Sequence, residues 1–348
     1  MVNILRSIIK TSFPLLVAFS ILFLFFSVLQ ISFFDVFSNL FMGAFGSFSK
    51  TANTLRAWIP LVICACGLVF TFKISLWNIG VEGQMIIGAV FGTAALKFLG
   101  SELDCVWAYV VVSVIAGFCG GALWGGVVGL LKTSAGVHEI FSGLGLNFLA
   151  QSVVLWLVFG PWKRLGGASM SGTELFCKKL WLPEIYIKGF SITGLILLFF
   201  VVITIILFFK TTKTGLRLEA VGNNSNAAFL FGLSPQRYML FAMLISGGLA
   251  GIAGVFQVTG VYHRLIPAIS SNYGYIALLV VILAGFNVWW ICAVSLFFAS
   301  LNMGSIQLPM IMQVDSSLAG VIQGVIVLAA LSVRSFKVKK KFYTKWTS

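Results

Sequence analysis

The sequence predicts an all-α, polytopic integral membrane protein with about ten transmembrane helices, some short or broken, and with cytosolic N- and C-termini. Of the 348 residues, 59% are hydrophobic and 9% are charged, whereas about 25% of the residues in an ordinary globular protein are charged. The chain contains 36 glycines and 34 phenylalanines, and glycine is more frequent in membrane helices than in soluble ones. With a mean hydropathy of +1.05, this composition excludes a soluble enzyme.

Apolar runs separated by polar turns define the predicted helices. The first run follows two basic residues and is too long for a signal peptide, so it is predicted to span the membrane. The run 275–286 covers only about 18 Å of a roughly 30 Å core, so we expect a partial helix that breaks near Asn287. The runs are 13–34, 58–72, 76–99, 106–131, 140–159, 192–209, from the loop ending at Arg237 to Gly260, 275–286, 288–303 and 318–333.

These runs predict three regions in the chain. Residues 1–56 hold the first helix and an outer segment with Lys50 and Arg56, and residues 57–333 form the main membrane domain. Residues 334–348 form a basic cytosolic tail. The main domain includes a long outer loop at 160–189 and a polar cytosolic loop at 210–237.

The net charge of +14 comes from 23 Lys and Arg against 9 Asp and Glu. In a soluble chain such an excess would suggest nucleic acid binding. Here the predicted topology puts 14 of the cations on the cytosolic side, six of them in the tail, and 9 outside. Because cytosolic loops of membrane proteins are enriched in Lys and Arg, the charge indicates orientation instead.

Several chemistries are excluded by missing motifs. The sequence contains no phosphate-binding loop of the form G-x-x-x-x-G-K-[ST], so the chain itself is not expected to hydrolyse nucleotide. Four of the six cysteines lie in apolar runs, where they behave as small hydrophobic residues. His138 and His263 lack a second nearby ligand, so neither a metal nor another cofactor is predicted on this chain.

The densest polar cluster is formed by Asn78, Glu82 and Gln84. Glycines on both sides of Glu82 weaken the helix and free backbone groups. A carboxylate in the membrane core is costly, so Glu82 needs the aqueous edge, a cavity or a partner such as Lys73. Asn78 and Glu82 stand four apart and would share a helical face. A path or gate for a solute and the capping of a re-entrant turn both remain open.

Two further groups of residues invite functional interpretations. His138 and Glu139 suggest a metal site or proton relay, but a turn that caps the following helix is favoured. Asn147 and Gln151 offer amides on one helical face without the cost of a charge, which suits an uncharged polar solute. Hydrogen bonding between helices explains the same pair equally well.

The run 106–131 carries glycines spaced three to five residues apart. Small residues along one face let a neighbouring helix approach closely, so packing is the favoured interpretation. These residues are Gly117, Gly120, Gly121, Gly125, Gly126 and Gly129.

The loop 210–237 predicts a short exposed helix. Its Asn/Ser cluster can cap the start of a helix and Gly232 can end it, and Ser234-Pro235 can start the next span. The apolar side chains of residues 229–231 in this short helix are expected to be buried against another surface. They either pack on the chain's own bundle or dock into a partner.

Four segments resemble a known family: NIGVEGQMIIGA, LKTSAGVHEIFSGLGLNFLA, GLRLEAVGNNSNAAFLFGL and SGGLAGIAGVFQ. They resemble permeases of bacterial ABC importers of the branched-chain amino acid and simple-sugar superfamily, and NIG-x-EGQ with GVHE is most similar to the nucleoside branch. The resemblance implies a second permease subunit, cytosolic ATPases that bind ATP-Mg, an external binding lipoprotein and the bacterial inner membrane. It assigns ATPase coupling to Glu219, Gly222, Asn223, Asn224, Ala227, Ala228 and Gly232.

The predicted function is therefore solute translocation by alternating access, with ATP hydrolysis on a separate chain. The favoured substrates are nucleosides or related polar solutes. The alternatives are a simple-sugar or branched-chain amino acid ABC permease, an ion-coupled carrier that uses Glu82 and Glu139 as relays, and a membrane anchor that moves no solute.

Overall fold

The computed structural model describes residues 17, 20–28, 30–100, 105–164, 172–183, 186–187, 190–306, 308–312, 317, 320–325 and 327–328. Two compact units can be distinguished, one from Leu55–Ser295 and the other from Met1–Thr54 with Leu296–Ser348. The predicted regions 1–56 and 57–333 stay predictions. The predicted basic tail, 334–348, lies outside the described residues.

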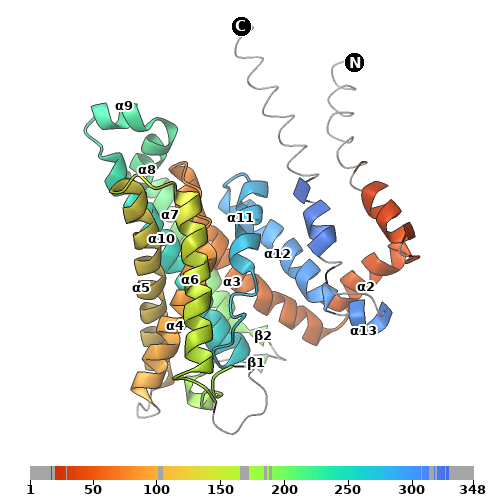
Figure 1. Ribbon diagram of the computed structural model, residues 1–348. Helices are drawn as coiled ribbons and strands as arrows, with labels where there is room; N and C mark the ends of the chain where they lie inside the picture. The colour runs from red at the N-terminus through yellow and green to blue at the C-terminus, as the bar shows by residue number, and fades with distance from the viewer. Residues whose placement is uncertain are drawn as a thin grey trace, which may run out of the picture. The chain divides into compact units, whose positions relative to one another are not determined.

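The larger unit is a helical bundle in which α4, α5 and α10 pack together, with α6 beside them (Figure 1). A short hairpin, β1 (Tyr186–Ile187) with β2 (Phe190–Ser191), precedes α7. The helices of this unit are α3 (Phe48–Lys73, from Leu55 onward), α4 (Val81–Leu99), α5 (Val106–Thr133), α6 (Glu139–Phe159), α7 (Ile192–Thr211), α8 (Lys213–Asn223), α9 (Ser225–Leu230), α10 (Pro235–Phe256) continued by a π-helix (Gln257–Tyr262), α11 (Tyr273–Leu283) and α12 (Val288–Ser305, as far as Ser295).

The smaller unit contains the bend that the sequence does not predict. Residues 20–28 are helical, the chain turns at Gln30 (φ 56°), and α2 (Phe33–Phe45) continues at 101° to the first helix. The predicted helix 13–34 is therefore wrong at its C-terminal end, because the chain leaves the helix before Gln30. Ser32 explains the new start, because its side chain caps α2 by accepting a hydrogen bond from the Asp35 N–H. With α13 (Leu308–Met312), these helices share a core around Phe26, Leu40 and Leu308.

Six of the described helices are long and apolar enough to cross a membrane, or up to seven if the bent pair counts as one span. They are α3, α5, α6, α7, α10 with its π-helix, and α12 with its continuation to Met312. This confirms a polytopic helical membrane protein. The predicted number of about ten spans and the cytosolic termini remain predictions.

Helix boundaries differ from the predictions at two places. Lys50 and Arg56 were expected in an outer segment, but they lie inside α3, which begins at Phe48. A side-chain bond supports this polar start of the helix: the Ser47 hydroxyl accepts a hydrogen bond from the Lys50 N–H at 3.3 Å. Residues 76–80 were expected in a helix, but α4 begins only at Val81. The break near Asn287 is confirmed, because α11 ends at Leu283 and the chain turns at Phe286 (φ 64°).

Glycines allow α5 and α10 to touch through their backbones. A Cβ atom added to Gly121 would lie 2.1 Å from the Gly247 carbonyl oxygen, and one on Gly251 would lie 2.0 Å from that of Gly117. A Cβ on Gly125 would meet the α10 backbone at 2.5 Å. The packing interpretation of the glycine-rich run is thus confirmed, since small residues are what permits such close approach.

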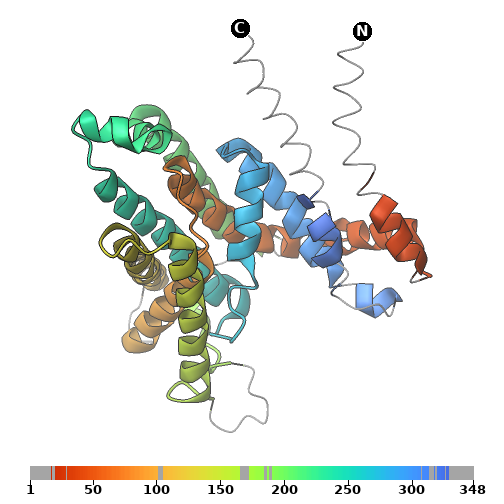
Figure 2. The ribbon, with the colours of Figure 1, turned by 45° about the horizontal axis from the view of Figure 1, so that its top comes forward.

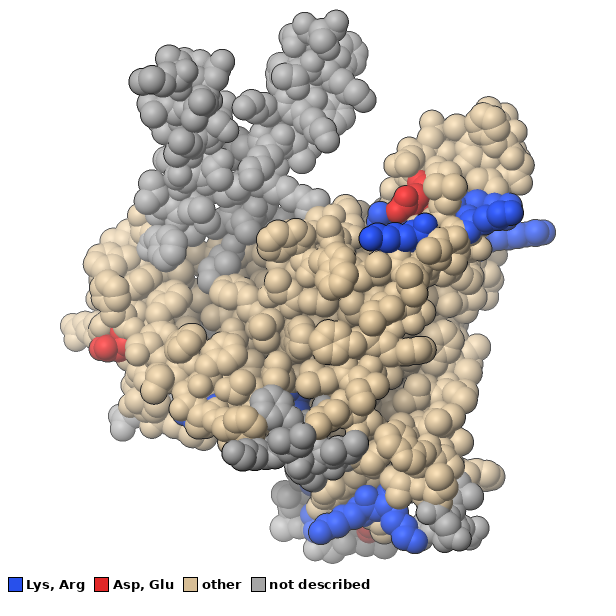
Figure 3. Space-filling model, turned by 180° about the vertical axis from the view of Figure 1, so that it is seen from behind, with Lys and Arg blue, Asp and Glu red and all other residues tan. Residues whose placement is uncertain are grey.

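Charged residues are concentrated at the ends of the larger unit. Figure 2 shows α8 and α9 at one end and the C-terminal end of α6 at the other. On the face in Figure 3, Lys and Arg gather in two groups with a broad uncharged region between them. Exposed Lys213, Arg217 and Arg237 belong to the end with α8, and exposed Lys163 follows α6 at the opposite end. An uncharged middle is what a chain embedded in hydrocarbon requires.

Candidate functional site

The centre of the site is the place where the first turns of α4 and α11 meet. Glu82 lies in the first turn of α4, and its Oε2 accepts a hydrogen bond from the Gly274 N–H of α11 at 2.8 Å. A Cβ atom on Gly274 would lie 2.5 Å from that oxygen, so only glycine fits there without a shift. A carboxylate at the N-terminus of a helix is stabilised by the helix dipole and by free N–H groups.

Of the three environments left open for Glu82, a cavity is the one found, and Lys73 is not its partner. Lys73 instead pairs with Glu219 of α8, with Nζ and Oε1 2.5 Å apart. Lys73 ends α3 at the end of the unit that carries α8, whereas Glu82 lies deeper in the bundle. Residues 74–80 connect the two, and the chain leaves the helix here because Ser75 adopts the left-handed conformation (φ 62°).

Hydrogen bonds of Asn78 and Gln84 hold this connecting segment against α4 and α10. Their side-chain amides exchange two hydrogen bonds, at 2.8 and 2.9 Å, and the Asn78 Nδ2 also donates to the Ser246 hydroxyl at 3.0 Å. All three residues are completely buried. Because Asn78 precedes α4, it does not share a helical face with Glu82, contrary to the prediction. Ser246 lies about 17 Å along α10 from Pro235, well inside this apolar helix.

Asn147 and Gln151 of α6 hold the other side of the site. The Asn147 Oδ1 accepts from the Gly83 N–H at 2.9 Å, while its Nδ2 donates to the Ile79 carbonyl at 2.9 Å. The Gln151 Nε2 donates to the Pro267 carbonyl at 2.9 Å, in the segment before α11. Both amides therefore bond to backbone groups that have no partner within a helix, namely a free N–H in the first turn of α4 and carbonyls of the two non-helical segments.

A cavity of about 320 Å³ lies between α4, α6 and the segment leading into α11. Its size falls within the range of small-molecule sites, roughly 300–1,000 Å³. Carboxylate, amide and hydroxyl groups face it together with two aromatic rings, which suits a small polar solute. Its lining includes Glu82, Asn147, Phe148, Gln151, Ser270, Asn272 and Tyr275. The structure thus brings together three of the five predicted path residues, while Asn78 and Gln84 lie outside this lining.

The contribution of residues 268–274 was missed, because this stretch was interpreted as part of an outer turn. Ser271 (φ 50°) and Asn272 (φ 59°) adopt the left-handed conformation, so the chain reverses here and re-enters the bundle as α11. A signal was present in the sequence: a Ser-Ser-Asn turn directly before an apolar helix too short to span.

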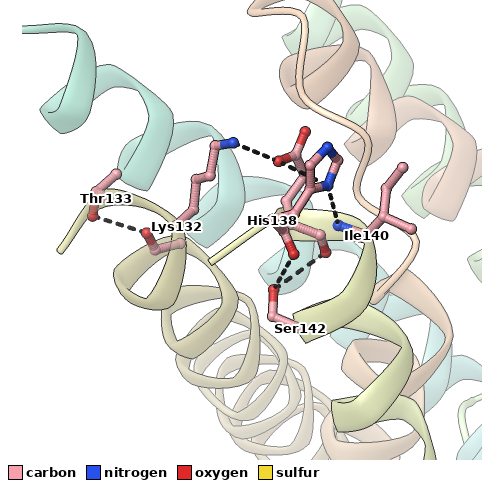
Figure 4. Close-up of polar contacts among 7 residues, drawn as sticks. Lys132, Thr133, His138, Ile140 and Ser142 are labelled. Carbon is pink, nitrogen blue, oxygen red and sulfur yellow. Dashed lines mark hydrogen bonds and ion pairs between the residues drawn. The ribbon is translucent and has the colours of Figure 1, made fainter. Parts of the chain in front are cut away.

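The turn between α5 and α6 confirms the capping interpretation of His138 (Figure 4). The His138 Nδ1 accepts a hydrogen bond from the Ile140 N–H at 3.4 Å. Lys132 at the end of α5 pairs with Glu139, with Nζ and Oε2 2.8 Å apart. No group of three potential metal ligands occurs among the residues that the structure describes. These contacts join two spanning helices at one end of the bundle.

The ion pair of Lys132 and Glu139 gives a first prediction. The Glu139 side chain is 6% exposed and that of Lys132 is 29% exposed. Lys132→Met leaves a buried carboxylate without its cation, so we expect the free energy of unfolding to fall by about 2–3 kcal/mol. Adding Glu139→Gln should restore part of this loss. A double-mutant cycle on the purified protein measures the coupling; the more exposed pair of Lys73 and Glu219 is the control, at about 0.5 kcal/mol. Equal coupling in both pairs would contradict the expectation.

The segment after α6 packs against residues 263–265, which precede the cavity-lining segment. The Thr173 N–H donates to the Leu265 carbonyl at 2.9 Å, and the Phe176 N–H donates to the His263 carbonyl at 2.9 Å. The rings of Trp181 and His263 stack with their centroids 3.7 Å apart. This part of the predicted outer loop 160–189 is therefore hydrogen-bonded to the stretch of chain that precedes the cavity-lining residues 268–275.

The polar loop after α7 contains the predicted short helix. Asn224 caps α9 by accepting a hydrogen bond from the Ala227 N–H at 3.0 Å, and Gly232 follows its end in the left-handed conformation (φ 80°). A Cβ on Gly222 would meet the Lys73 carbonyl oxygen, so α8 touches the end of α3 at this glycine. Ala228 is buried, whereas Leu230 is 85% exposed.

The exposed apolar residues of this loop are not covered by the described part of the chain. Phe229 is 66% and Phe231 is 87% exposed. Of the predicted coupling residues, Ala228 packs inward and Glu219 is held by Lys73, while Asn223 and Asn224 are exposed. The exposed apolar surface at α9 is therefore formed by Phe229, Leu230 and Phe231, which are not among the residues predicted for ATPase coupling.

Residues 50–331 match the family described as the permease component of branched-chain amino acid transport systems. The chain belongs to this family. The permease is 27% identical over 314 residues to the glucose ABC transporter permease protein of Haloferax volcanii, covering 87% of this chain and 81% of that protein. It is 26% identical over 316 residues to the guanosine ABC transporter permease protein of Bacillus subtilis, covering 88% and 89%. A nucleoside ABC transporter permease protein of Lactococcus lactis is 25% identical over 278 residues, covering 77% and 76%. The predicted resemblance is thus confirmed: this chain is a multi-pass membrane permease, similar to transport subunits of other ABC importers.

Proposed function

We propose that this permease is the translocation subunit of an ATP-driven ABC importer for nucleosides or sugars. The observation that carries the proposal is the polar cavity at the meeting point of α4 and α11, which holds the Glu82 carboxylate inside an apolar bundle. A buried carboxylate in a membrane protein is expensive and marks a path for solute or ion.

The chemistry of the cavity supports a polyhydroxylated solute. Glu82 supplies a hydrogen-bond acceptor, and the amides of Asn147 and Gln151 supply donors and acceptors. The rings of Phe148 and Tyr275 offer flat faces beside them. Relatives of this permease carry names that specify glucose, guanosine and nucleosides, all of which contain sugar hydroxyls.

The other subunits follow from this role. A cytosolic ATPase would bind ATP-Mg and receive α9, because the exposed side chains of Phe229 to Phe231 form an apolar surface that needs a partner. A second permease subunit and an extracytoplasmic binding lipoprotein complete the importer in the bacterial inner membrane. Orientation with α8 and α9 in the cytosol agrees with the basic residues at that end.

The decisive experiment is uptake by proteoliposomes that contain the complete importer with its binding protein. Radiolabelled guanosine and glucose would be offered separately, with and without ATP on the side of the ATPase. We expect uptake of one of them only with ATP. Uptake driven by a proton or sodium gradient in the absence of ATP would contradict the proposal and support the ion-coupled carrier, with Glu82 and Glu139 as relays.

The coupling role of α9 gives a second prediction. Ala228 is a poor site for testing it, because a bulky residue there would disturb the packing of α9 itself. Leu230→Asp changes an 85% exposed side chain and should leave the fold intact. Loss of one apolar anchor at an interface costs about 2 kcal/mol, so we expect ATP-driven uptake to fall by about tenfold or more. The matched control is Leu175→Asp, which is 60% exposed at the opposite end of the unit. Normal uptake by the Leu230 variant would show that α9 is not the contact.

A further inference from the structure

A second pocket, unrelated to the solute path, lies beside the base of the α8–α9 loop. Its volume is about 550 Å³. It is formed by the start of α8, the turn after α9 and the first two turns of α10. The side chains that matter for its chemistry are Thr214, Arg217, Ser234, Arg237, Tyr238 and Phe241.

The pocket is lined by two arginines, so it carries two positive charges. Arg217 and Arg237 both line it, and within the described part of the chain neither forms an ion pair. The nearest acidic residue along α8, Glu219, is already paired with Lys73. Figure 3 shows Lys and Arg gathered at this end of the unit. Two guanidinium groups in one pocket favour a ligand with phosphate or carboxylate oxygens.

Three hydroxyl groups in the same pocket are free to take part. Among the described residues, the side chains of Thr214, Ser234 and Tyr238 have no hydrogen-bond partner. Ser234 stands at the start of α10, where its side chain makes no capping bond. Together with the arginines, these hydroxyls can donate to several oxygens of one anionic group.

The position of the pocket argues for a lipid as the source of that group. The apolar α7 ends at Thr211, and α10 begins its course through the bundle at Pro235. Phe241 forms the apolar side of the pocket, and its ring lies 6.4 Å from that of Phe208 on α7. Further along α7, Ile203 and Leu207 are each 52% exposed. An anionic group bound in this pocket would therefore lie next to exposed apolar side chains of the protein.

We infer that this pocket binds the phosphate headgroup of an anionic phospholipid, held by Arg217 and Arg237, with the acyl chains beside α7. Clusters of Lys and Arg directly beside a spanning helix at the membrane surface bind such headgroups. A bound lipid would bridge α8 and α10, the two helices that flank α9, and would fix the loop that carries it. This inference does not depend on which solute the permease carries.

The experiment uses the full chain in detergent, titrated with phosphatidylglycerol, with bound lipid counted by native mass spectrometry. The test variant is Arg217→Gln/Arg237→Gln. Its control is Lys178→Gln/Lys179→Gln, which removes the same charge from exposed residues at the other end. We expect affinity for phosphatidylglycerol to fall by roughly fivefold for each arginine, or about twentyfold in the double variant. The control should stay within about twofold.

Several outcomes would overturn the inference. Equal binding of phosphatidylcholine, or an equal loss in the lysine control, would show attraction without a specific site. Competition by inorganic phosphate at the same concentration would point to a small-anion site. Unchanged lipid binding with weaker binding of the ATPase would show that the arginines pair with acidic residues of that partner. If the double variant fails to fold, Arg217→Lys/Arg237→Lys must retain lipid binding, and each single glutamine variant must lose part of it.

Discussion

Gly251→Leu is expected to prevent the permease from folding stably. A Cβ atom at this position would lie 2.0 Å from the carbonyl oxygen of Gly117 and 2.9 Å from its carbonyl carbon. Both are backbone atoms of α5, so no side-chain rotation can relieve the clash. The two helices must move apart, and the dispersion contacts that hold membrane helices together are then lost along their whole length.

We expect a loss of about 3 kcal/mol or more, at or above the upper end of the usual range for overpacking. Thermal unfolding of the purified protein in detergent measures it as a lower melting temperature or as loss of folded yield. Gly145→Leu is the matched control, because an added Cβ at Gly145 of α6 meets nothing within 4 Å. A melting temperature for the Gly251 variant close to that of the control would show that α5 and α10 are not held in backbone contact.

Glu82→Gln is expected to reduce uptake by the assembled importer about tenfold. The glutamine is nearly the same size, but it replaces the charged acceptor of the Gly274 N–H with a neutral one. A hydrogen bond to a charged group contributes about 1.5–3 kcal/mol, and each 1.4 kcal/mol corresponds to a factor of ten. The change also removes the carboxylate that faces the cavity.

Two companion variants separate the role of the contact from a general effect of charge. Glu174→Gln removes one negative charge at an exposed position and should transport normally. Gly274→Ala disrupts the same contact from α11, because the added Cβ would lie 2.5 Å from the Glu82 carboxylate oxygen. It should reduce uptake to a similar extent. Normal uptake by Glu82→Gln, with a lower melting temperature, would leave Glu82 a purely structural role in joining α4 to α11.

Much of the fold follows from local sequence features. Apolar runs long enough to cross a bilayer predict α5, α6, α7 and α10 to within a few residues. The caps of α9, Asn224 and the glycine after its end, are local signals too, because each acts on backbone groups within four residues. The shortness of the run before Asn287 predicts the partial helix α11 correctly, since length alone decides whether a helix can span.

The candidate site could be predicted only in part. Glu82, Asn147 and Gln151 stand out because polar side chains inside apolar runs are costly and need a reason. Nothing local indicates that Glu82 would be bonded to Gly274 and not to Lys73. That choice depends on the path of residues 263–272, which return into the bundle. It brings together residues nearly two hundred positions apart in the sequence.

The sequence by itself determined that this protein is a polytopic helical permease, where most of its spans lie, and which few polar residues are buried at a cost. Hydropathy, helix length and capping are properties of short stretches of chain, so they can be read without knowing the neighbours. Only the tertiary structure decided which freed backbone groups each polar side chain satisfies, which glycines touch, and that α4 and α11 meet at Glu82. Those pairings arise from packing between distant helices, where the requirement to satisfy every polar group inside the membrane selects one partner among several.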